Sequence, residues 1–392
     1  ARGGAFVSGT CECGGRVKTS VVIFLGWMAI CWARLWMGMP GGAGLAVAMM
    51  MALLVIAYVS FTYSEVTHNA MLSVAGEPRR LAMISGLGLG LGNLAATLIF
   101  IAIALLFVLP AMIGWPFAVP QFGVDLASFE HARMVGPICA VWLVLFSIPF
   151  FRNARDTGVP GASWIAAFRD GARSVWRTVR EAAQYRQLMT FLIARMFYAD
   201  AMAALLALGA VYVALFLGRN FLEMLCYAIF ASACAFCGGI FGGWLEGKVG
   251  VKRALALEIL AMIVVGLVQL SITRDSLFLG LVENVVVWDG LVFRTLSDLV
   301  YLGLISVIAV TATASISSSR SMLVTLAPPG RSGEFFGLYA IAGTITVWMG
   351  PLLVEQFTLW SGDQRIGMTS IHLLFVIGLA ALLTVRMPDR AT

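Results

Sequence analysis

Residues 187–218 read QLMTFLIARMFYADAMAALLALGAVYVALFLG, an almost unbroken apolar run. A helix needs about 20 apolar residues to cross the hydrocarbon core of a bilayer, so this run is long enough to span it. Two charged residues, Arg195 and Asp200, nevertheless lie inside it. Each costs about 2.5–3.5 kcal/mol at the bilayer centre on insertion scales. We therefore expect one membrane-spanning helix with Asp200 close to the midplane.

Arg195 and Asp200 are not expected to pair with each other, because five residues correspond to about 140° around a helix. Each charge then needs a partner on another helix, a water-filled cavity or a change of protonation. This pattern indicates a transport site, in which Asp200 contacts the substrate or couples its movement to proton binding. The alternative is a pair of buried charges that only hold helices together.

The composition predicts an all-α polytopic membrane protein with the lipid bilayer as its surroundings. The chain is 60% hydrophobic and 12% charged, whereas soluble domains are about 25% charged. The net charge of +6 does not indicate nucleic-acid binding, because the basic residues lie in short connections between apolar runs. The seven cysteines are scattered, so no metal site is expected, and no cofactor either.

Ten apolar segments are predicted to span the membrane. They cover about residues 20–36, 43–63, 83–109, 134–151, 187–218, 222–245, 253–272, 299–319, 335–358 and 368–385. Residues 273–298 are moderately apolar but interrupted, and we interpret them as a loop; an eleventh span there would reverse the orientation of everything that follows. The expected organisation is an incomplete N-terminal half (1–151), a cytoplasmic amphipathic linker (152–186) and a six-helix half (187–392).

Alternate glycines begin the third predicted span, which reads SGLGLGLGNLAA from Ser85. Gly86/Gly90 and Gly88/Gly92 form two small-xxx-small pairs, which allow helix backbones to approach closely. A nucleotide-binding glycine loop would need a preceding strand, and the sequence contains no strand signal there. Helix packing is therefore the preferred interpretation.

The distribution of basic residues predicts the orientation. Most of the 26 Lys and Arg residues fall on one side when the ten spans alternate. Because cytoplasmic loops carry the excess of basic residues, we expect both chain ends to be cytoplasmic. The membrane is expected to be the inner membrane of a bacterium.

The connection after the sixth predicted span resembles the signature loop of the major facilitator superfamily, G-x-L-x-D-R-x-G-x-K/R. It reads GGWLEGKVGVKR over residues 242–253. The matching residues are Gly243, Leu245, Lys248, Gly250 and Lys252. Gly247 occupies the acidic position, with Glu246 adjacent. The resemblance implies a loop that bridges cytoplasmic helix ends, with any charge relay shifted to Glu246. Gly243 and Gly250 are expected where helix ends approach closely, and Lys248 is expected to contact a helix terminus or a carboxylate.

Four further stretches resemble the vacuole-effluxer branch of that superfamily, the autophagy-related amino-acid effluxers and their bacterial relatives. They are HNAML at 68–72, SGLGLGLGNLA at 85–95, FYAD at 197–200, and SRSMLVTLAP with GEFFGLYAIAGTITVWMGP between 319 and 351. The family patterns are Y-N-A-F-L-P, S-x-x-G-x-x-L-G-Y-L-G, Y-N-D-G and S-R-S-x-x-x-x-L-x-P…E-F-F-G-L-Y…G-P. His68 for Tyr, Asn93 for Tyr and Ala201 for Gly depart from them, which suggests a divergent member with a different substrate.

The resemblance implies a helical bundle of twelve spans in two halves. The first span of this chain matches the third of the family, and GGRVK at 14–18 resembles the tail of the first half's signature loop. We therefore expect the first two helices to be missing from the sequence as given, as in a truncated gene model or fragment.

The leading functional hypothesis is a secondary transporter, working as a monomer, that moves a small solute by alternating access, with protons as the coupling ion. The resemblance implies efflux of amino acids or related metabolites. Candidate substrate or coupling residues are Asp200, Arg195, Tyr198, Asn69 and Asn93. Candidate gating residues are Gly243, Glu246, Lys248, Gly250, Lys252 and Arg320.

Two other classes compete with this hypothesis. A membrane enzyme is not expected, because the three histidines lie on separate segments and no H-E-x-x-H pair occurs. A non-transporting scaffold or receptor, or an inactive transporter fragment, remains the alternative. ATP-driven pumping is not expected because the sequence has no G-x-x-x-x-G-K-[ST] loop.

The orientation can be tested by cysteine labelling in a background where the native cysteines are replaced. A cysteine at Ser174 should not react with an impermeant maleimide added to intact cells, and should react after lysis. A cysteine at Asp289, in a loop expected outside, should react in both cases. Efficient labelling at position 174 in intact cells would contradict the predicted topology.

Overall fold

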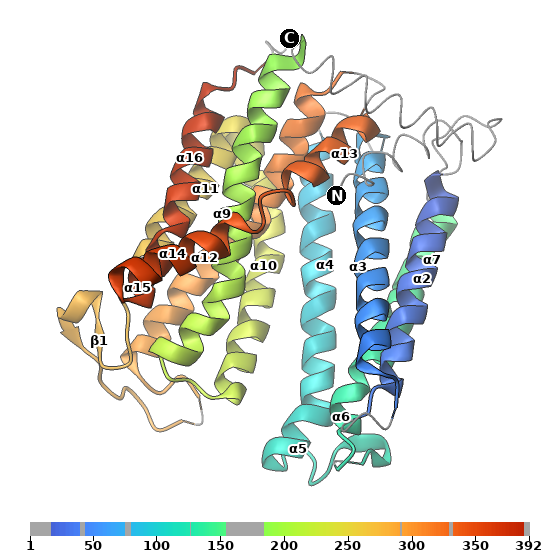
Figure 1. Ribbon diagram of the computed structural model, residues 1–392, viewed down its shortest axis with the longest axis vertical. Coiled ribbons are helices and arrows are strands. Elements are labelled where there is room, and N and C mark those ends of the chain that lie inside the picture. Colours follow the sequence, from blue (N-terminus) through green and yellow to red (C-terminus); the bar gives the residue numbers. More distant parts are fainter. Residues whose placement is uncertain are drawn as a thin grey trace. The chain divides into compact units, whose positions relative to one another are not determined.

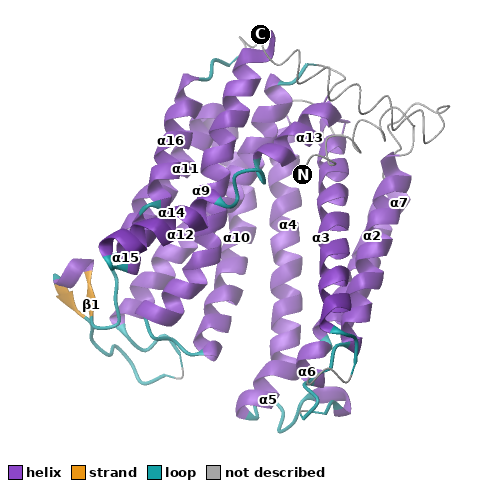
Figure 2. Cartoon of the chain, in the orientation of Figure 1, coloured by secondary structure: helices purple, strands orange, loops and turns teal. Residues whose placement is uncertain are grey.

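The computed structural model describes residues 17–39, 44–74, 80–125, 127–153, 184–290, 292–328 and 332–387. Helices make up nearly all of this part of the chain (Figure 1, Figure 2). The long ones are α2 (Val17–Arg34), α3 (Val47–Ala70), α4 (Leu81–Ile103), α7 (Val135–Asn153), α9 (Arg186–Phe216), α10 (Phe221–Val249), α11 (Val251–Gln269), α12 (Leu296–Leu326), α13 (Ser332–Ala342), α14 (Met349–Ser361) and α16 (Ile371–Thr384). Short helices are α5 (Leu109–Ile113), α6 (Glu130–Arg133) and α15 (Gln364–Thr369).

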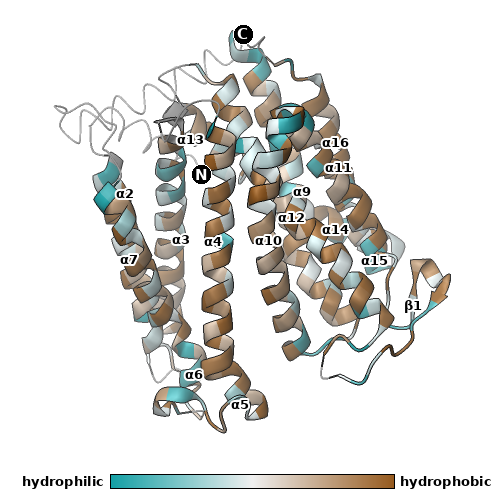
Figure 3. Cartoon of the chain, turned by 180° about the vertical axis from the view of Figure 1, so that it is seen from behind, coloured by the Kyte–Doolittle hydropathy of each residue, from teal (hydrophilic) through white to brown (hydrophobic). Residues whose placement is uncertain are grey.

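Eight helical segments within the described residues are long and apolar enough to cross a membrane. They are Lys18–Met37, Val47–Asn69, Leu81–Ile113, Glu130–Asn153, Arg186–Phe216, Leu222–Val249, Leu296–Leu326 and Gln364–Thr384. Apolar residues cover most of their length (Figure 3). Large apolar side chains are exposed on them, such as Met51 and Val55 at 58% each, as expected for surfaces that face lipid. The predicted all-α membrane protein is confirmed; the count of ten spans is not.

Two of the ten predicted spans are not among the eight membrane-spanning candidates of the structure, namely the seventh and the ninth. The seventh forms one continuous helix, α11, but its first half carries Lys252, Arg253 and Glu258. The ninth was expected to be continuous over 335–358. It is instead broken into α13 and α14, which are joined by turns at residues 343–348.

Residues 273–290 and 292–295 form a loop rather than an eleventh span, as expected, except that α12 already begins at Leu296. Within this loop, β1 (Ser276–Leu277) pairs antiparallel with β2 (Val282–Glu283). The two strands are too short to cross a membrane.

The chain divides into two compact units. One contains residues 75–96 and 179–392, and the other contains 2–74 and 97–178, so the division falls within α4. In the first unit α12 packs along α10 and α11, and α16 packs along α9; in the second, α2 packs along α3 and α7. The amphipathic linker helix expected at 152–186 lies almost entirely outside the described residues. The predicted domain boundaries stay predictions.

Glycines bring α4 and α10 into backbone contact. A Cβ atom on Gly86 would lie 2.1 Å from the carbonyl oxygen of Gly239, and one on Gly90 would lie 2.9 Å from that of Phe236. By contrast, Gly88 and Gly92 face open space. One of the two predicted small-xxx-small pairs therefore mediates helix packing, and the other does not.

This difference predicts opposite effects for two similar substitutions on one helix. Gly86→Ala should lower the free energy of unfolding by about 1–3 kcal/mol, because the new methyl group forces two backbones apart. The control Gly88→Ala should be neutral or stabilising by up to about 1 kcal/mol, since alanine favours a helix and meets no atom. Thermal unfolding of the purified variants measures both; equal melting temperatures would show that the contact does not form.

Candidate functional site

Arg195 lies against the C-terminal end of α13. Its Nε atom donates to the backbone carbonyl of Tyr339 at 3.2 Å, and its guanidinium carbon lies 3.4 Å from the centroid of the Tyr339 ring. Tyr339 is in the last turn of α13, where carbonyl groups carry the negative end of the helix dipole. The arginine charge is therefore stabilised by a helix end and by an aromatic face.

Asp200 lies against the N-terminal end of α14. The backbone N–H of Gly350, the second residue of this helix, donates to Asp200 Oδ2 at 3.1 Å. The side chain of Asp200 is 1% exposed, and among the described residues Oδ1 has no hydrogen-bond partner. A carboxylate at a helix N-terminus is stabilised by the positive end of the dipole. Gly350 is required here, because a Cβ atom would lie 2.7 Å from Cβ of Ala204.

Arg195 and Asp200 thus do not pair with each other, as their spacing predicted. At the break between α13 and α14, the C-terminal end of α13 binds the Arg195 cation and the N-terminal end of α14 binds the Asp200 carboxylate. Between them, the Thr346 hydroxyl donates to the Met196 carbonyl at 2.9 Å and fastens the turn to α9. A broken helix at membrane depth is tolerated only where other groups satisfy its free backbone atoms, and α9 provides such groups here.

Tyr198 extends this site towards α12. Its hydroxyl lies 2.7 Å from Ser319 Oγ, and the Tyr339 hydroxyl donates to the same Oγ atom at 3.0 Å. All three side chains are buried. The FYAD stretch and the stretch from 319 to 351 therefore meet in one place, with Ser319, Tyr339 and Gly350 around Tyr198 and Asp200.

Asn69 and Asn93 lie elsewhere. Asn69 is buried on α3, in the other unit. On α4, Asn93 donates from Nδ2 to the Leu89 carbonyl at 3.0 Å, and its own carbonyl accepts from Ser232 Oγ of α10 at 3.3 Å. Asn93 thus takes part in the contact between α4 and α10.

The signature-like loop forms the junction of α10 and α11. A Cβ atom on Gly243 would lie 3.2 Å from Met83 Cα, which is the close approach expected there. Gly250 was also expected at a close approach, but a Cβ atom on it would meet no atom of the described residues within 4 Å. Gly250 instead adopts a φ of +84° at the turn between the helices, a conformation that favours glycine.

Lys252 performs the role that we expected of Lys248. Its Nζ atom donates to the carbonyl oxygens of Leu383 and Val385 at 2.8 and 2.7 Å, and so caps the C-terminal end of α16. Lys248 Nζ lies 4.2 Å from the centroid of the Trp244 ring. Glu246 and Arg320 both make interactions within the protein, and Arg320 is partly buried near the end of α12.

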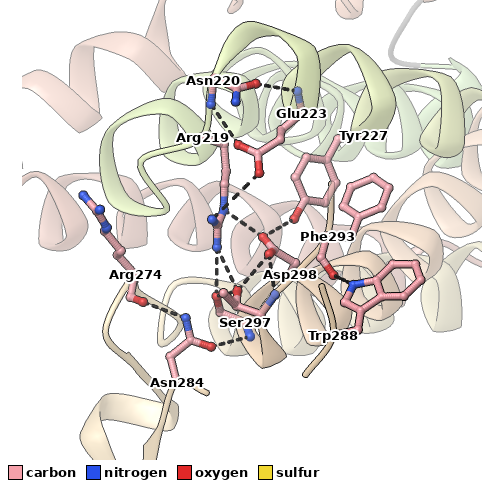
Figure 4. A network of polar contacts seen from close by, with 11 residues as sticks. Arg219, Asn220, Glu223, Tyr227, Arg274, Asn284, Trp288, Phe293, Ser297 and Asp298 are labelled. Carbon is pink, nitrogen blue, oxygen red and sulfur yellow. Dashed lines mark hydrogen bonds and ion pairs between the residues drawn. The ribbon is translucent and has the colours of Figure 1, made fainter. Parts of the chain in front are cut away.

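A largely buried ion pair, which the sequence did not predict, joins the loop that precedes α10 to the first turn of α12 (Figure 4). Arg219 Nε lies 2.7 Å from Asp298 Oδ1, and Tyr227 donates to the same oxygen at 2.9 Å. The two helices begin with capping boxes, Asn220 with Glu223 and Thr295 with Asp298. The N-x-x-E and T-x-x-D spacings could have located both helix starts, although not their contact through Arg219.

An apolar cavity of about 220 Å³ lies between α9, α10, α11 and α12. Its walls are mainly aliphatic, with Tyr227, Gln269 and Tyr301 as polar side chains. Gln269 and Tyr301 are hydrogen-bonded to each other at 2.5 Å.

Comparison with known proteins identifies the family. The family described as "Vacuole effluxer Atg22 like" matches residues 73–391. The chain belongs to this family. The Atg22-like chain is 25% identical over 330 residues to an uncharacterized MFS-type transporter of Bacillus subtilis. The matched region covers 83% of the Atg22-like chain and 68% of the Bacillus protein. It is also 26% identical over 318 residues to autophagy-related protein 22-1 of Aspergillus clavatus. Here the matched region covers 78% of the Atg22-like chain and 49% of the fungal protein.

The Atg22-like chain therefore spans about half the length of the fungal relative. Among solved structures it resembles the human organic anion transporter MFSD10, with a TM-score of 0.64, 17% identity and coverage of 97% and 80% of the two chains. It also resembles the Escherichia coli fucose:proton symporter, with a TM-score of 0.61, 15% identity and coverage of 99% and 91%. These likenesses establish the major facilitator fold.

The buried ion pair predicts a large loss of stability when one partner is removed. Asp298→Asn removes the nearest carboxylate of Arg219, whose side chain is 13% exposed. Among the described residues, Glu223 at 4.0 Å is then its remaining ionic partner, beside the hydroxyl groups of Thr295 and Ser297. Breaking a buried pair typically costs about 3–5 kcal/mol, so the melting temperature should fall clearly. The control Asp289→Asn affects the exposed pair with Arg294 and should leave it unchanged. Equal melting temperatures for Asp298→Asn and the unaltered protein would contradict a buried pair.

Proposed function

We propose that this Atg22-like chain is a secondary transporter that moves a small solute across a membrane by alternating access. The proposal rests on the placement of Arg195 and Asp200 on the two sides of the break between α13 and α14. Arg195 lies at the C-terminal end of α13, and Asp200 lies at the N-terminal end of α14. Discontinuous helices whose ends face charged groups are typical of substrate and ion sites in secondary transporters. The family description and the major facilitator fold support the same function.

The proposed substrates are amino acids or related metabolites, and the proposed direction is efflux. The family is described as a vacuole effluxer, which supports the direction. The site supports a substrate with opposite charges, because Arg195 and Asp200 lie about 7.5 Å apart along the axis of α9 at 1.5 Å per residue. Arg195 is partly exposed and is the proposed contact for a carboxylate.

Asp200 is the proposed coupling residue, with Tyr198 as its neighbour on the way to α12. Asp200 is buried, and its Oδ1 atom has no hydrogen-bond partner among the described residues, which supports a role in binding a proton or a cationic group of the substrate. The fucose:proton and proton:xylose symporters among the structural neighbours couple transport to protons, which supports the choice of ion. We place the chain, as a monomer, in a bacterial plasma membrane with both ends cytoplasmic.

The test is flux in proteoliposomes with a panel of labelled amino acids and an imposed pH gradient. Asp200→Asn keeps the shape of the side chain and removes its charge. Accumulation driven by the gradient should fall at least about tenfold, which corresponds to about 1.4 kcal/mol, while exchange of solute across the membrane persists. Asp289→Asn, at an exposed position, serves as the matched control.

Unchanged gradient-driven accumulation in Asp200→Asn would show that this residue is structural. No flux of any solute in the unaltered protein would contradict the transporter assignment and favour a scaffold or receptor.

A further inference from the structure

Glu258 is a second buried carboxyl group in the unit that holds the candidate site. It lies on α11 and is 1% exposed. Its Oε1 atom accepts from Ser318 Oγ of α12 at 3.1 Å. Among the described residues, its Oε2 atom has no hydrogen-bond partner. Asp200 accepts from a backbone N–H at a helix N-terminus, whereas the hydrogen bond that Glu258 accepts comes from a side-chain hydroxyl in the interior of α12.

Among the described residues, Glu258 forms no ion pair with a Lys, Arg or His side chain of the helices packed against α11, which are α10, α12 and α16. The charged group of α10 that acts on it is Glu246, which has the same sign of charge. On α12, Arg320 follows Ser318 by two residues and so leaves the helix about 200° away from it. On α16, His372 contacts Gly266, about 12 Å further along α11 at 1.5 Å per residue.

The stretch of α12 around Ser318 is rich in buried hydroxyl groups. Ser317 and Ser321 flank Ser318 on α12 and are buried, and within the described part of the chain neither Oγ atom has a hydrogen-bond partner. A buried carboxylate without a cation costs several kcal/mol more than the neutral acid. The neutral acid avoids that cost: it keeps the hydrogen bond from Ser318 to Oε1 and carries an O–H donor on Oε2 in place of the charge.

We propose that Glu258 is a proton-binding site: in this arrangement of α10, α11 and α12 its Oε2 atom carries a proton taken from water, and the group releases that proton as hydronium when water or a cation reaches it. This site is separate from the one at Asp200. The inference deepens the proposed function, because a second exchangeable proton would make the transport cycle depend on pH at the α11–α12 contact as well.

A proton is favoured over a sodium ion by the chemistry of the groups present. A metal cation of this kind needs several oxygen ligands around it. The described residues contain no group of three or more His, Cys, Asp or Glu side chains that could hold a metal ion. A proton needs a single oxygen atom.

Infrared difference spectroscopy of the purified full chain in lipid tests this proposal without a known substrate. At neutral pH the spectrum should contain the C=O band of a buried protonated carboxyl group, and the band should disappear at alkaline pH. Glu258→Gln should lose this band, whereas the matched Asp200→Asn variant should keep it. Ser318→Ala should move the band to higher frequency, because the C=O group loses its hydrogen-bond donor.

Each outcome decides the question. Because Asp200 is itself proposed to bind a proton, Glu258→Gln is also made in the Asp200→Asn background. The proposal is wrong if the band persists in that double variant, or if no protonated carboxyl group is present at neutral pH. A band that appears only when sodium is removed would assign the site to sodium instead. If Glu258→Gln does not fold, the shift in Ser318→Ala still identifies the group. A band without solute flux would contradict the proposed transport function while leaving this inference intact.

Discussion

The first unit depends on one constraint: α9 places two opposite charges against the two helix ends at the break between α13 and α14. α13 and α14 expose free backbone groups where they are interrupted, and α9 meets two of those groups with Arg195 and Asp200. The carbonyl of Met196 in α9 accepts a hydrogen bond from the Thr346 side chain in the turn. Either partner alone is unfavourable in a bilayer: the charges because of desolvation, and the broken helix because of unpaired peptide groups. Together they compensate each other, and the interruption becomes a stable part of the fold.

The same unit is fixed at its two ends by different chemistry. At the ends where α10 and α12 begin, the Arg219–Asp298 pair ties two capped helix starts together. At the start of α11, Lys252 holds the last carbonyls of α16. Between these ends lie the apolar cavity and the two buried carboxyl groups. The helix termini are therefore held by charge, while the middle of the bundle has room and unsatisfied polar atoms.

The sequence was informative where a rule acts within one helix. The spacing of Arg195 and Asp200 predicted their separation, and the glycine pattern predicted a close contact of α4. Which glycine pair makes that contact depends on the rotation of α4 about its axis, and no local rule determines it. The break at 343–348 was missed because GTITVW is apolar and continues the hydrophobic run. Arg219 and Asp298 are far apart in the chain, so only the fold reveals their pairing.

The contact between Gly86 and Gly239 has a mechanical consequence. Helices usually lock together because the ridges of one fit the grooves of the other. Here the two backbones touch without any intervening side chain, so no rotamer must change when one helix turns or slides slightly against the other. The glycines thus hold α4 and α10 close together, while the contact between them does little to oppose a small rotation of one helix against the other.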